Sequence, residues 1–166
     1  MSRAFVKEND LEHAGIDIPE RPISSEKNYV TPNGLKGLEV KIANLEECRA
    51  KLLLNNKDIN KQKKMQFERD LRYFINRLES AIIVNPQKQD KNKVLFSASV
   101  DVENKIGEIL NFQIVGEDES NIKINKIAYT SPLATALIGN AIWDEVLWQK
   151  PSGNEILTIV KIQYKL

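Results

Sequence analysis

Hydrophobic positions in the middle of the chain recur every three or four residues, which is the period of an α-helix. The first apolar stripe consists of Leu35, Leu38, Ile42, Leu45 and Leu52. The second consists of Phe67, Leu71, Phe74, Leu78 and Ala81. Residues 54–60 between them, LNNKDIN, are rich in side chains that favour a turn. Because each stripe is as narrow as a coiled-coil seam, residues 31–84 are predicted to form an antiparallel helical hairpin, with Thr31 as cap and Pro32 at its first helical position.

From Lys93 onward the apolar period changes to two, which is typical of β-strands. Five segments show it: residues 93–103, 108–116, 122–130, 144–150 and 155–165. The sequence PSGN at 151–154 predicts a hairpin turn between the last two. Residues 131–139, SPLATALIG, predict a compact helix that Ser131 caps, Pro132 opens and Gly139 closes in a left-handed conformation. We therefore expect residues 93–166 to form a small antiparallel sheet with one short helix, which makes the chain α+β.

The remaining segments show neither period. Residues 1–30 contain Pro19 and Pro22 among scattered charges, which predicts an extended or disordered N-terminal arm. A strap packed along the rest of the protein is the alternative interpretation. Residues 85–92, NPQKQDKN, are expected to be a linker between the hairpin and the sheet domain.

Charge is balanced overall but not along the chain. The 166 residues carry 24 Lys and Arg against 23 Asp and Glu, so no general basic character indicates a nucleic-acid-binding protein. The segment from Arg49 to Arg72 nevertheless holds 8 basic residues against Asp58, Glu68 and Asp70. A solvated helix face is the simpler explanation of such a run, but its position around the hairpin turn favours a role in contacts.

Several classes of protein are excluded by what the chain lacks. With one cysteine, Cys48, and one histidine, His13, it has no disulfide framework and no zinc site built on those residues. The longest stretch without a charge, from Ile127 to Trp143, is too short for a membrane span. The N-terminus also lacks the apolar core of a signal peptide, so we expect a cytoplasmic protein without membrane contact.

Residues 111–166 strongly resemble the C-terminal domain of the bacterial Gre transcription elongation factors, GreA and GreB. The motifs that carry the resemblance are IVGEDE at 114–119, SPLATALIG at 131–139 and PSGNEILTIVKIQY at 151–164. The opening MSRAFVKEND together with NYVTPNGL resembles a GreB-like subgroup that has an N-terminal extension, here with a shortened coiled coil. The resemblance implies an FKBP-like C-terminal domain that docks on bacterial RNA polymerase. The coiled coil then enters the secondary channel of the polymerase, and the protein acts as a binding protein and not as an enzyme.

The resemblance also implies site residues. Ser131 and Pro132 match the junction that docks on the polymerase, although a Ser-Pro pair is also simply a good helix start. Basic side chains near the RNA 3′ end are a family feature, and phosphate attraction is its physical basis. The candidates here for contact with nascent RNA or polymerase are Lys57, Lys61, Lys63, Lys64, Arg69 and Arg72.

The hairpin tip departs from the family pattern. Cleavage-stimulating Gre factors present an Asp and a Glu that help to hold a catalytic Mg²⁺, whereas Asp58 is the only carboxylate in this turn. The nearest others, Glu47 and Glu68, are about 15 Å away if both lie on helices. Because Mg²⁺ requires close oxygen ligands and Lys57 adjoins Asp58, we expect weak or no stimulation of transcript cleavage. No cofactor of the protein's own is predicted, and contact with the polymerase Mg²⁺ through Asp58 stays open.

Other interpretations remain. Three adjacent carboxylates, Glu117, Asp118 and Glu119, could bind a hard cation, but an exposed turn is the expected structure. An FKBP-like fold could be a prolyl isomerase or chaperone, with aromatic residues lining a proline pocket instead of packing in the core. The aromatic candidates are Phe96, Phe112, Tyr129, Trp143, Trp148 and Tyr164. Exposed seams could also pair between chains, although a monomer is expected.

Overall fold

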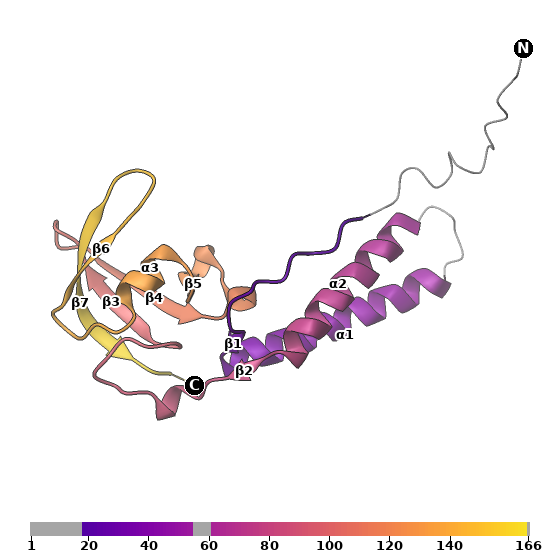
Figure 1. Ribbon diagram of the computed structural model, residues 1–166, viewed down its shortest axis with the longest axis horizontal. Coiled ribbons are helices and arrows are strands. Elements are labelled where there is room, and N and C mark those ends of the chain that lie inside the picture. Colours follow the sequence, from indigo (N-terminus) through magenta and orange to yellow (C-terminus); the bar gives the residue numbers. More distant parts are fainter. Residues whose placement is uncertain (1–17, 55–60, 166) are drawn as a thin grey trace, which may run out of the picture. The chain divides into compact units, whose positions relative to one another are not determined.

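The computed structural model describes residues 18–54 and 61–165. Contacts between residues divide the chain into two units. The first comprises Met1–Ile23 and Lys41–Asn76, and the second comprises Ser24–Val40 and Arg77–Leu166. The predicted α+β class is confirmed, since a helical hairpin precedes a curled sheet with one short helix (Figure 1).

The two helices of the hairpin are α1 (Pro32–Leu54) and α2 (Lys61–Glu79). Thr31 caps α1 as predicted, because its Oγ1 accepts a hydrogen bond of 2.9 Å from the backbone N–H of Gly34. The second helix ends at Glu79, before the predicted boundary at residue 84. There the side chain of Asn28 donates to the carbonyl of Arg77 at 2.6 Å, so a buried side chain satisfies a carbonyl at the helix end.

After α2 the chain continues in an extended conformation. Strand β2 (Ile82–Ile83) pairs in parallel with β1 (Tyr29–Val30), a pair that the sequence pattern did not indicate. Isoleucine is β-branched and therefore favours strands over helices, which agrees with an early end of α2. Residues 24–30 of the predicted arm thus belong to the second unit, where β1 lies beside β2.

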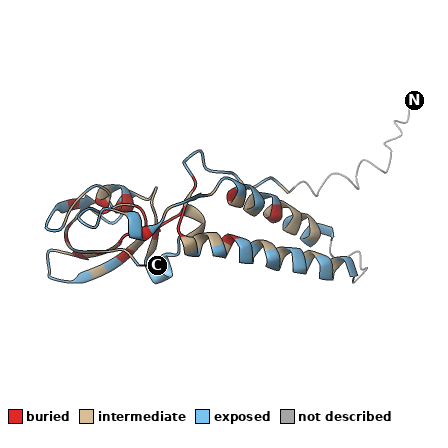
Figure 2. Cartoon of the chain, turned by 90° about the horizontal axis from the view of Figure 1, so that it is seen from below, coloured by how far each residue is buried: buried red, intermediate tan, exposed pale blue. Residues whose placement is uncertain are grey.

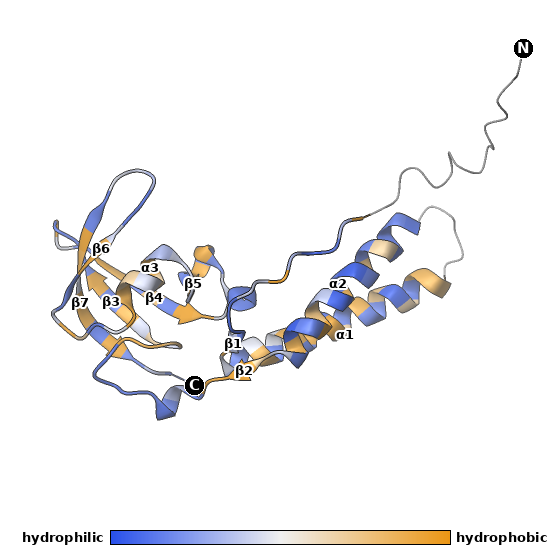
Figure 3. Cartoon of the chain, viewed as in Figure 1, coloured by the Kyte–Doolittle hydropathy of each residue, from blue (hydrophilic) through white to orange (hydrophobic). Residues whose placement is uncertain are grey.

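The helices bury little. Leu38 is the one residue of α1 that is fully buried, and Leu71 and Arg77 are buried in α2. Figure 2 shows accordingly few buried positions along the helices. Hydrophobic and hydrophilic positions alternate along both helices (Figure 3). The narrow stripes inferred from the sequence are therefore mostly half-buried, and the polar positions face solvent.

Gly37 offers a stabilising substitution within α1. A Cβ built on Gly37 meets no atom within 4 Å, and the residue lies inside the helix. We expect Gly37→Ala to raise the free energy of unfolding by about 0.5–1 kcal/mol, because alanine reduces the entropy of the unfolded chain. Urea unfolding measures the change. A Gly37→Ala protein that is less stable than the wild type would contradict the open space seen at this position.

The sheet of the second unit has five strands. They are β3 (Ser99–Glu103), β4 (Ile109–Val115), β5 (Lys126–Ala128), β6 (Glu145–Trp148) and β7 (Glu155–Gln163), in the spatial order β5-β4-β3-β7-β6. All neighbouring pairs are antiparallel except β4 and β5, so the sheet is mixed where an antiparallel one was predicted. Two short 3₁₀ turns, η4 (Glu117–Glu119) and η5 (Ile122–Ile124), lie between these strands, and β5 then runs in the same direction as β4.

The core of the second unit lies between the sheet and helix α3 (Pro132–Leu137). Alternate residues of the strands are buried, among them Val100 and Val102 of β3, in agreement with the period of two. Helix α3 contributes Leu133, Ala134 and Leu137. Its predicted boundaries are confirmed: Ser131 accepts a hydrogen bond from the backbone N–H of Ala134, and Gly139 has a φ of +91°.

Candidate functional site

An apolar groove of about 390 Å³ opens beside the start of α3. Its walls come from segments that are far apart in the sequence: strands β4 and β5, turn η5, the start of α3, and the end of β6 with the turn that follows it. The lining residues are Phe112, Ile122, Ile127, Ser131, Pro132, Leu133, Trp148, Gln149, Lys150, Pro151 and Ser152. Both residues predicted to dock, Ser131 and Pro132, therefore border a concave and largely apolar surface.

Two features of the groove favour contact with a partner. Pro132 is exposed and Ile122 is 71% exposed, so apolar side chains are available at the rim. Trp148 and Phe112 both line the groove, and their rings pack edge-on with centroids 5.8 Å apart. On the turn side, Lys150 pairs with Glu155 and lies over the Trp148 ring at 4.7 Å. The groove thus combines two packed aromatic rings with exposed apolar side chains.

A buried arginine of α2 pairs with the acidic turn η4. The predicted exposed turn at Glu117, Asp118 and Glu119 is wrong, because the side chains of Asp118 and Glu119 are only 10% and 11% exposed. Arg77, 2% exposed, donates to Asp118 at 2.5 Å and to Glu117 at 3.2 Å. These carboxylates can be largely withdrawn from solvent because the guanidinium of Arg77, 40 positions before Glu117, pairs with both of them.

The third carboxylate of the turn connects it to the start of α1. Glu119 accepts a hydrogen bond from the Thr31 hydroxyl at 2.5 Å and pairs with Lys126 at 2.9 Å. Beside the turn, a Cβ on Gly116 would lie 2.5 Å from the carbonyl oxygen of Tyr29, so only glycine fits there. The described residues contain no group of side chains arranged to hold a metal ion, and η4 holds basic side chains instead.

Comparison with known proteins places this arrangement in a family. The family model described as the C-terminal domain of the transcription elongation factors GreA and GreB matches residues 88–164, which include every residue that lines the groove. The chain is also 33% identical over 155 residues to the transcription elongation factor GreB of Haemophilus ducreyi, covering 84% of this chain and 96% of that protein. The chain belongs to the GreA/GreB family of transcription elongation factors.

Other relatives match over shorter lengths or at lower identity. GreB of Pseudomonas aeruginosa is 39% identical over 104 residues, which cover 61% of this chain and 62% of that protein. A solved structure of a transcription elongation factor GreA/GreB from Nitrosomonas europaea is 22% identical and covers 83% of this chain and all of that one, with a TM-score of 0.42. The resemblance inferred from the motifs is confirmed by the family model and by the GreB relatives.

The basic residues predicted on the hairpin differ in whether their charge is paired with a carboxylate. Lys61 and Lys63 are exposed, and neither pairs with a carboxylate among the residues that the structure describes. The other three have one each: Lys64 with Glu68 at 3.9 Å, Arg69 with Asp70 at 3.0 Å, and Arg72 with Glu20. Lys57 and Asp58 lie outside the described residues.

In the first unit, the described end of the arm packs on α2. The Arg21 guanidinium lies 3.8 Å from the centre of the Tyr73 ring and 3.7 Å from an oxygen of Asp70. The hydrogen bond from Arg72 lowers the pKa of the Glu20 carboxyl below its ordinary value. For residues 18–23 the strap interpretation therefore describes the structure better than a disordered arm.

Among the described helices, none has both the length and the apolar character needed to cross a membrane.

The predicted aromatic candidates have different surroundings. Phe96 and Phe112 belong to the core, and Tyr129, Trp148 and Tyr164 pack partly buried against it. Trp143 is 70% exposed, so core packing does not explain that residue. Phe112 and Trp148 also line the groove. A period of two placed these rings on strands, but it could not indicate that two of them share one cavity.

Proposed function

We propose that this GreA/GreB-family protein binds bacterial RNA polymerase through the groove beside Ser131 and Pro132 and inserts its helical hairpin in the secondary channel. The observation that supports the docking site is the groove itself, because the two residues that the resemblance indicated border an apolar cavity with exposed Pro132 and Ile122. Exposed apolar surface beside packed aromatic side chains is typical of protein interfaces.

The length and the charge of the hairpin support such an insertion. Helix α1 has 23 residues, which at 1.5 Å per residue extend about 35 Å. Lys61 and Lys63 at the start of α2 leave unpaired positive charge near the tip among the described residues. Positive charge at that end attracts phosphate groups and favours contact with nascent RNA inside the complex.

A pull-down of purified bacterial core RNA polymerase by the full chain tests the proposal. We expect the polymerase to be retained, and retention to be lost when a known secondary-channel ligand is present in excess. Failure to retain the polymerase at micromolar concentrations would refute the proposal.

We expect the protein to stimulate transcript cleavage weakly or not at all. The carboxylates nearest the tip among the described residues are already paired: Glu47 with Lys51 at 2.6 Å, and Glu68 with Lys64 at 3.9 Å. Asp58 therefore has no second carboxylate with which to hold Mg²⁺. The assay measures cleavage of a defined backtracked complex with Mg²⁺, for the wild type and for Asp58→Ala. Cleavage near the background rate is expected for both, whereas strong cleavage that disappears in Asp58→Ala would show the prediction to be wrong.

A prolyl isomerase is the second candidate function, because Phe112 and Trp148 line the same groove. That function requires catalysed isomerisation of a proline-containing peptide in the absence of polymerase. A peptide isomerisation assay separates the two candidates, and we expect no acceleration over the uncatalysed rate.

A further inference from the structure

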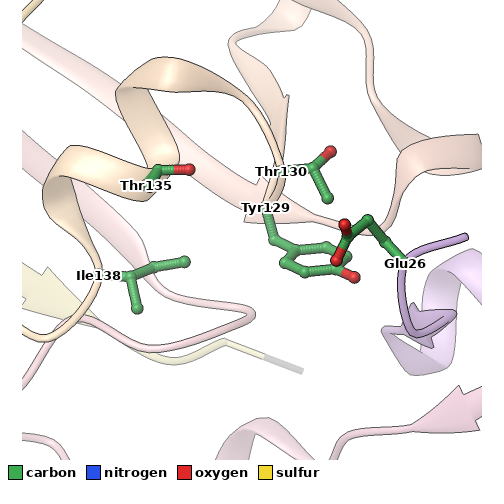
Figure 4. A pocket seen from close by; sticks show the side chains of 5 residues that line it. All are labelled: Glu26, Tyr129, Thr130, Thr135 and Ile138. Atoms are coloured by element: carbon green, nitrogen blue, oxygen red, sulfur yellow. The ribbon is translucent and has the colours of Figure 1, made fainter.

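A second cavity, of about 370 Å³, borders the turn that leads into α3. It is lined by Glu26, Tyr129, Thr130, Thr135 and Ile138. Figure 4 shows Glu26 approaching from the extended segment before β1, with its carboxylate directed toward the Tyr129 ring, while Thr135 and Ile138 come from α3 and its end. Because Thr130 directly precedes Ser131 in the sequence, this cavity and the apolar groove both border the junction at the start of α3.

The hydroxyl groups of the cavity have already donated their hydrogens. Tyr129 donates to the carbonyl of Lys27 at 2.5 Å, and Thr135 donates to the carbonyl of Ser131 at 2.9 Å. Thr130 donates to a carboxylate oxygen of Glu117 at 3.4 Å. A hydroxyl whose hydrogen is committed can only accept further hydrogen bonds. The three hydroxyl groups therefore offer lone pairs and no donor to a ligand in the cavity.

Glu26 adds an uncompensated negative charge. Its side chain is exposed and makes no ion pair or hydrogen bond within the described part of the chain, where only its backbone N–H is bonded, to Ser24. This charge acts on Tyr129 in the cavity wall. Burial raises the pKa of Tyr129 above its ordinary value, and the carboxylates of Glu117 and Glu26 raise it further. A carboxylate together with acceptor oxygens disfavours an anion and suits a cation that donates several hydrogen bonds.

We propose that this cavity receives an arginine side chain of the docking partner and that Glu26 pairs with its guanidinium group. The partner is taken from the proposed function, so it is an arginine on the polymerase surface that meets the loop at Ser131. Arginine fits better than lysine because its planar guanidinium forms paired hydrogen bonds with a carboxylate and stacks on an aromatic ring such as that of Tyr129. Glu26 precedes residues 88–164, which match the family's C-terminal domain. The N-terminal segment would therefore add a contact of its own that determines specificity for the partner.

The first test compares the affinity of two full-length variants for core polymerase. We expect Glu26→Gln to weaken binding about threefold at low salt, with a smaller effect at high salt, because an exposed ion pair contributes modestly and is screened. The matched control is Glu145→Gln on β6, which removes the same charge from an exposed side chain that does not line the cavity. Equal losses in both variants, or no loss in Glu26→Gln, would overturn the proposal.

The second test needs no polymerase and therefore separates the cavity from the proposed function. N-acetyl-arginine amide is titrated into the ¹⁵N-labelled protein, with N-acetyl-lysine amide in parallel. We expect millimolar binding that shifts the amide signals of Thr130 and Thr135, is weaker for the lysine compound and is lost in Glu26→Gln. Shifts in a protein that fails to bind polymerase would support the cavity while refuting the proposed function. The absence of shifts, with polymerase binding intact, would refute the arginine site alone.

Discussion

Replacing Arg77 by methionine is expected to lower the free energy of unfolding of the second unit by about 3 kcal/mol, since removing one partner of a buried ion pair leaves the other charge uncompensated. We expect a loss at the lower end of the usual range because Glu117, one of the two carboxylates that pair with Arg77, keeps 24% of its side chain exposed. Asp118, 10% exposed, cannot be hydrated in the same way. Both tryptophans, Trp143 and Trp148, belong to the second unit, so fluorescence during urea unfolding reports on the correct part of the chain.

Two further variants separate the ion pair from a general effect of substitution in α2. Arg72→Met removes another arginine that is paired with a carboxylate, Glu20, but this pair is exposed and should leave the unfolding midpoint nearly unchanged. Neutralising the turn with Glu117→Gln and Asp118→Asn should restore part of the stability lost in Arg77→Met. If Arg72→Met and Arg77→Met are equally destabilised, the ion pairs of Arg77 with Glu117 and Asp118 do not stabilise the second unit.

Placing a carboxylate in the apolar groove is expected to weaken polymerase binding about 30-fold or more, because an unpaired charge that loses its water in an interface costs about 2 kcal/mol or more. The variant is Ile122→Asp, at a side chain that is 71% exposed and lines the groove. An exposed isoleucine contributes little to the core, so the variant should fold normally. Affinity for core polymerase is measured by titration, and the unfolding midpoint is measured alongside it.

Ile106→Asp is the matched control for this substitution. Ile106 is 78% exposed and does not line the groove, so it presents the same change of side chain away from the proposed contact. Its affinity for polymerase should stay close to that of the wild type. Equal affinities for the Ile122 and Ile106 variants would remove the groove from the docking surface.

The features that were predicted correctly depend on short stretches of sequence. The caps at Thr31 and Ser131 are satisfied by backbone N–H groups three residues later, and Gly139 adopts the left-handed conformation its position required. The hairpin turn at 151–154 has its glycine, Gly153, at a φ of +123°. Such features can be derived from a few neighbouring residues because propensity and local hydrogen bonding determine them.

The features that were missed depend on residues far apart in the chain. Nothing around Arg77 distinguishes it from the solvated basic residues of α2, and its burial follows from carboxylates about 40 positions away. The carbonyl of Arg77 near the end of α2 likewise accepts a hydrogen bond from Asn28, which is 49 positions away. The groove was predicted only at Ser131 and Pro132, since its other walls come from separate strands and turns. Composition and period do not indicate which distant segments meet, so these contacts required the structure.

Cys48 allows a direct test of whether the hairpin enters the secondary channel of the polymerase. It is the only cysteine in the chain, and it is exposed on α1 in the first unit. A photoactivatable cross-linker attached to Cys48 can therefore be mapped on core polymerase without changing the sequence. We predict cross-links to the walls of the secondary channel that disappear in Ile122→Asp and persist in Ile106→Asp. Cross-links confined to the outer surface of the polymerase, or none from a protein that binds it, would contradict insertion of the hairpin in the channel.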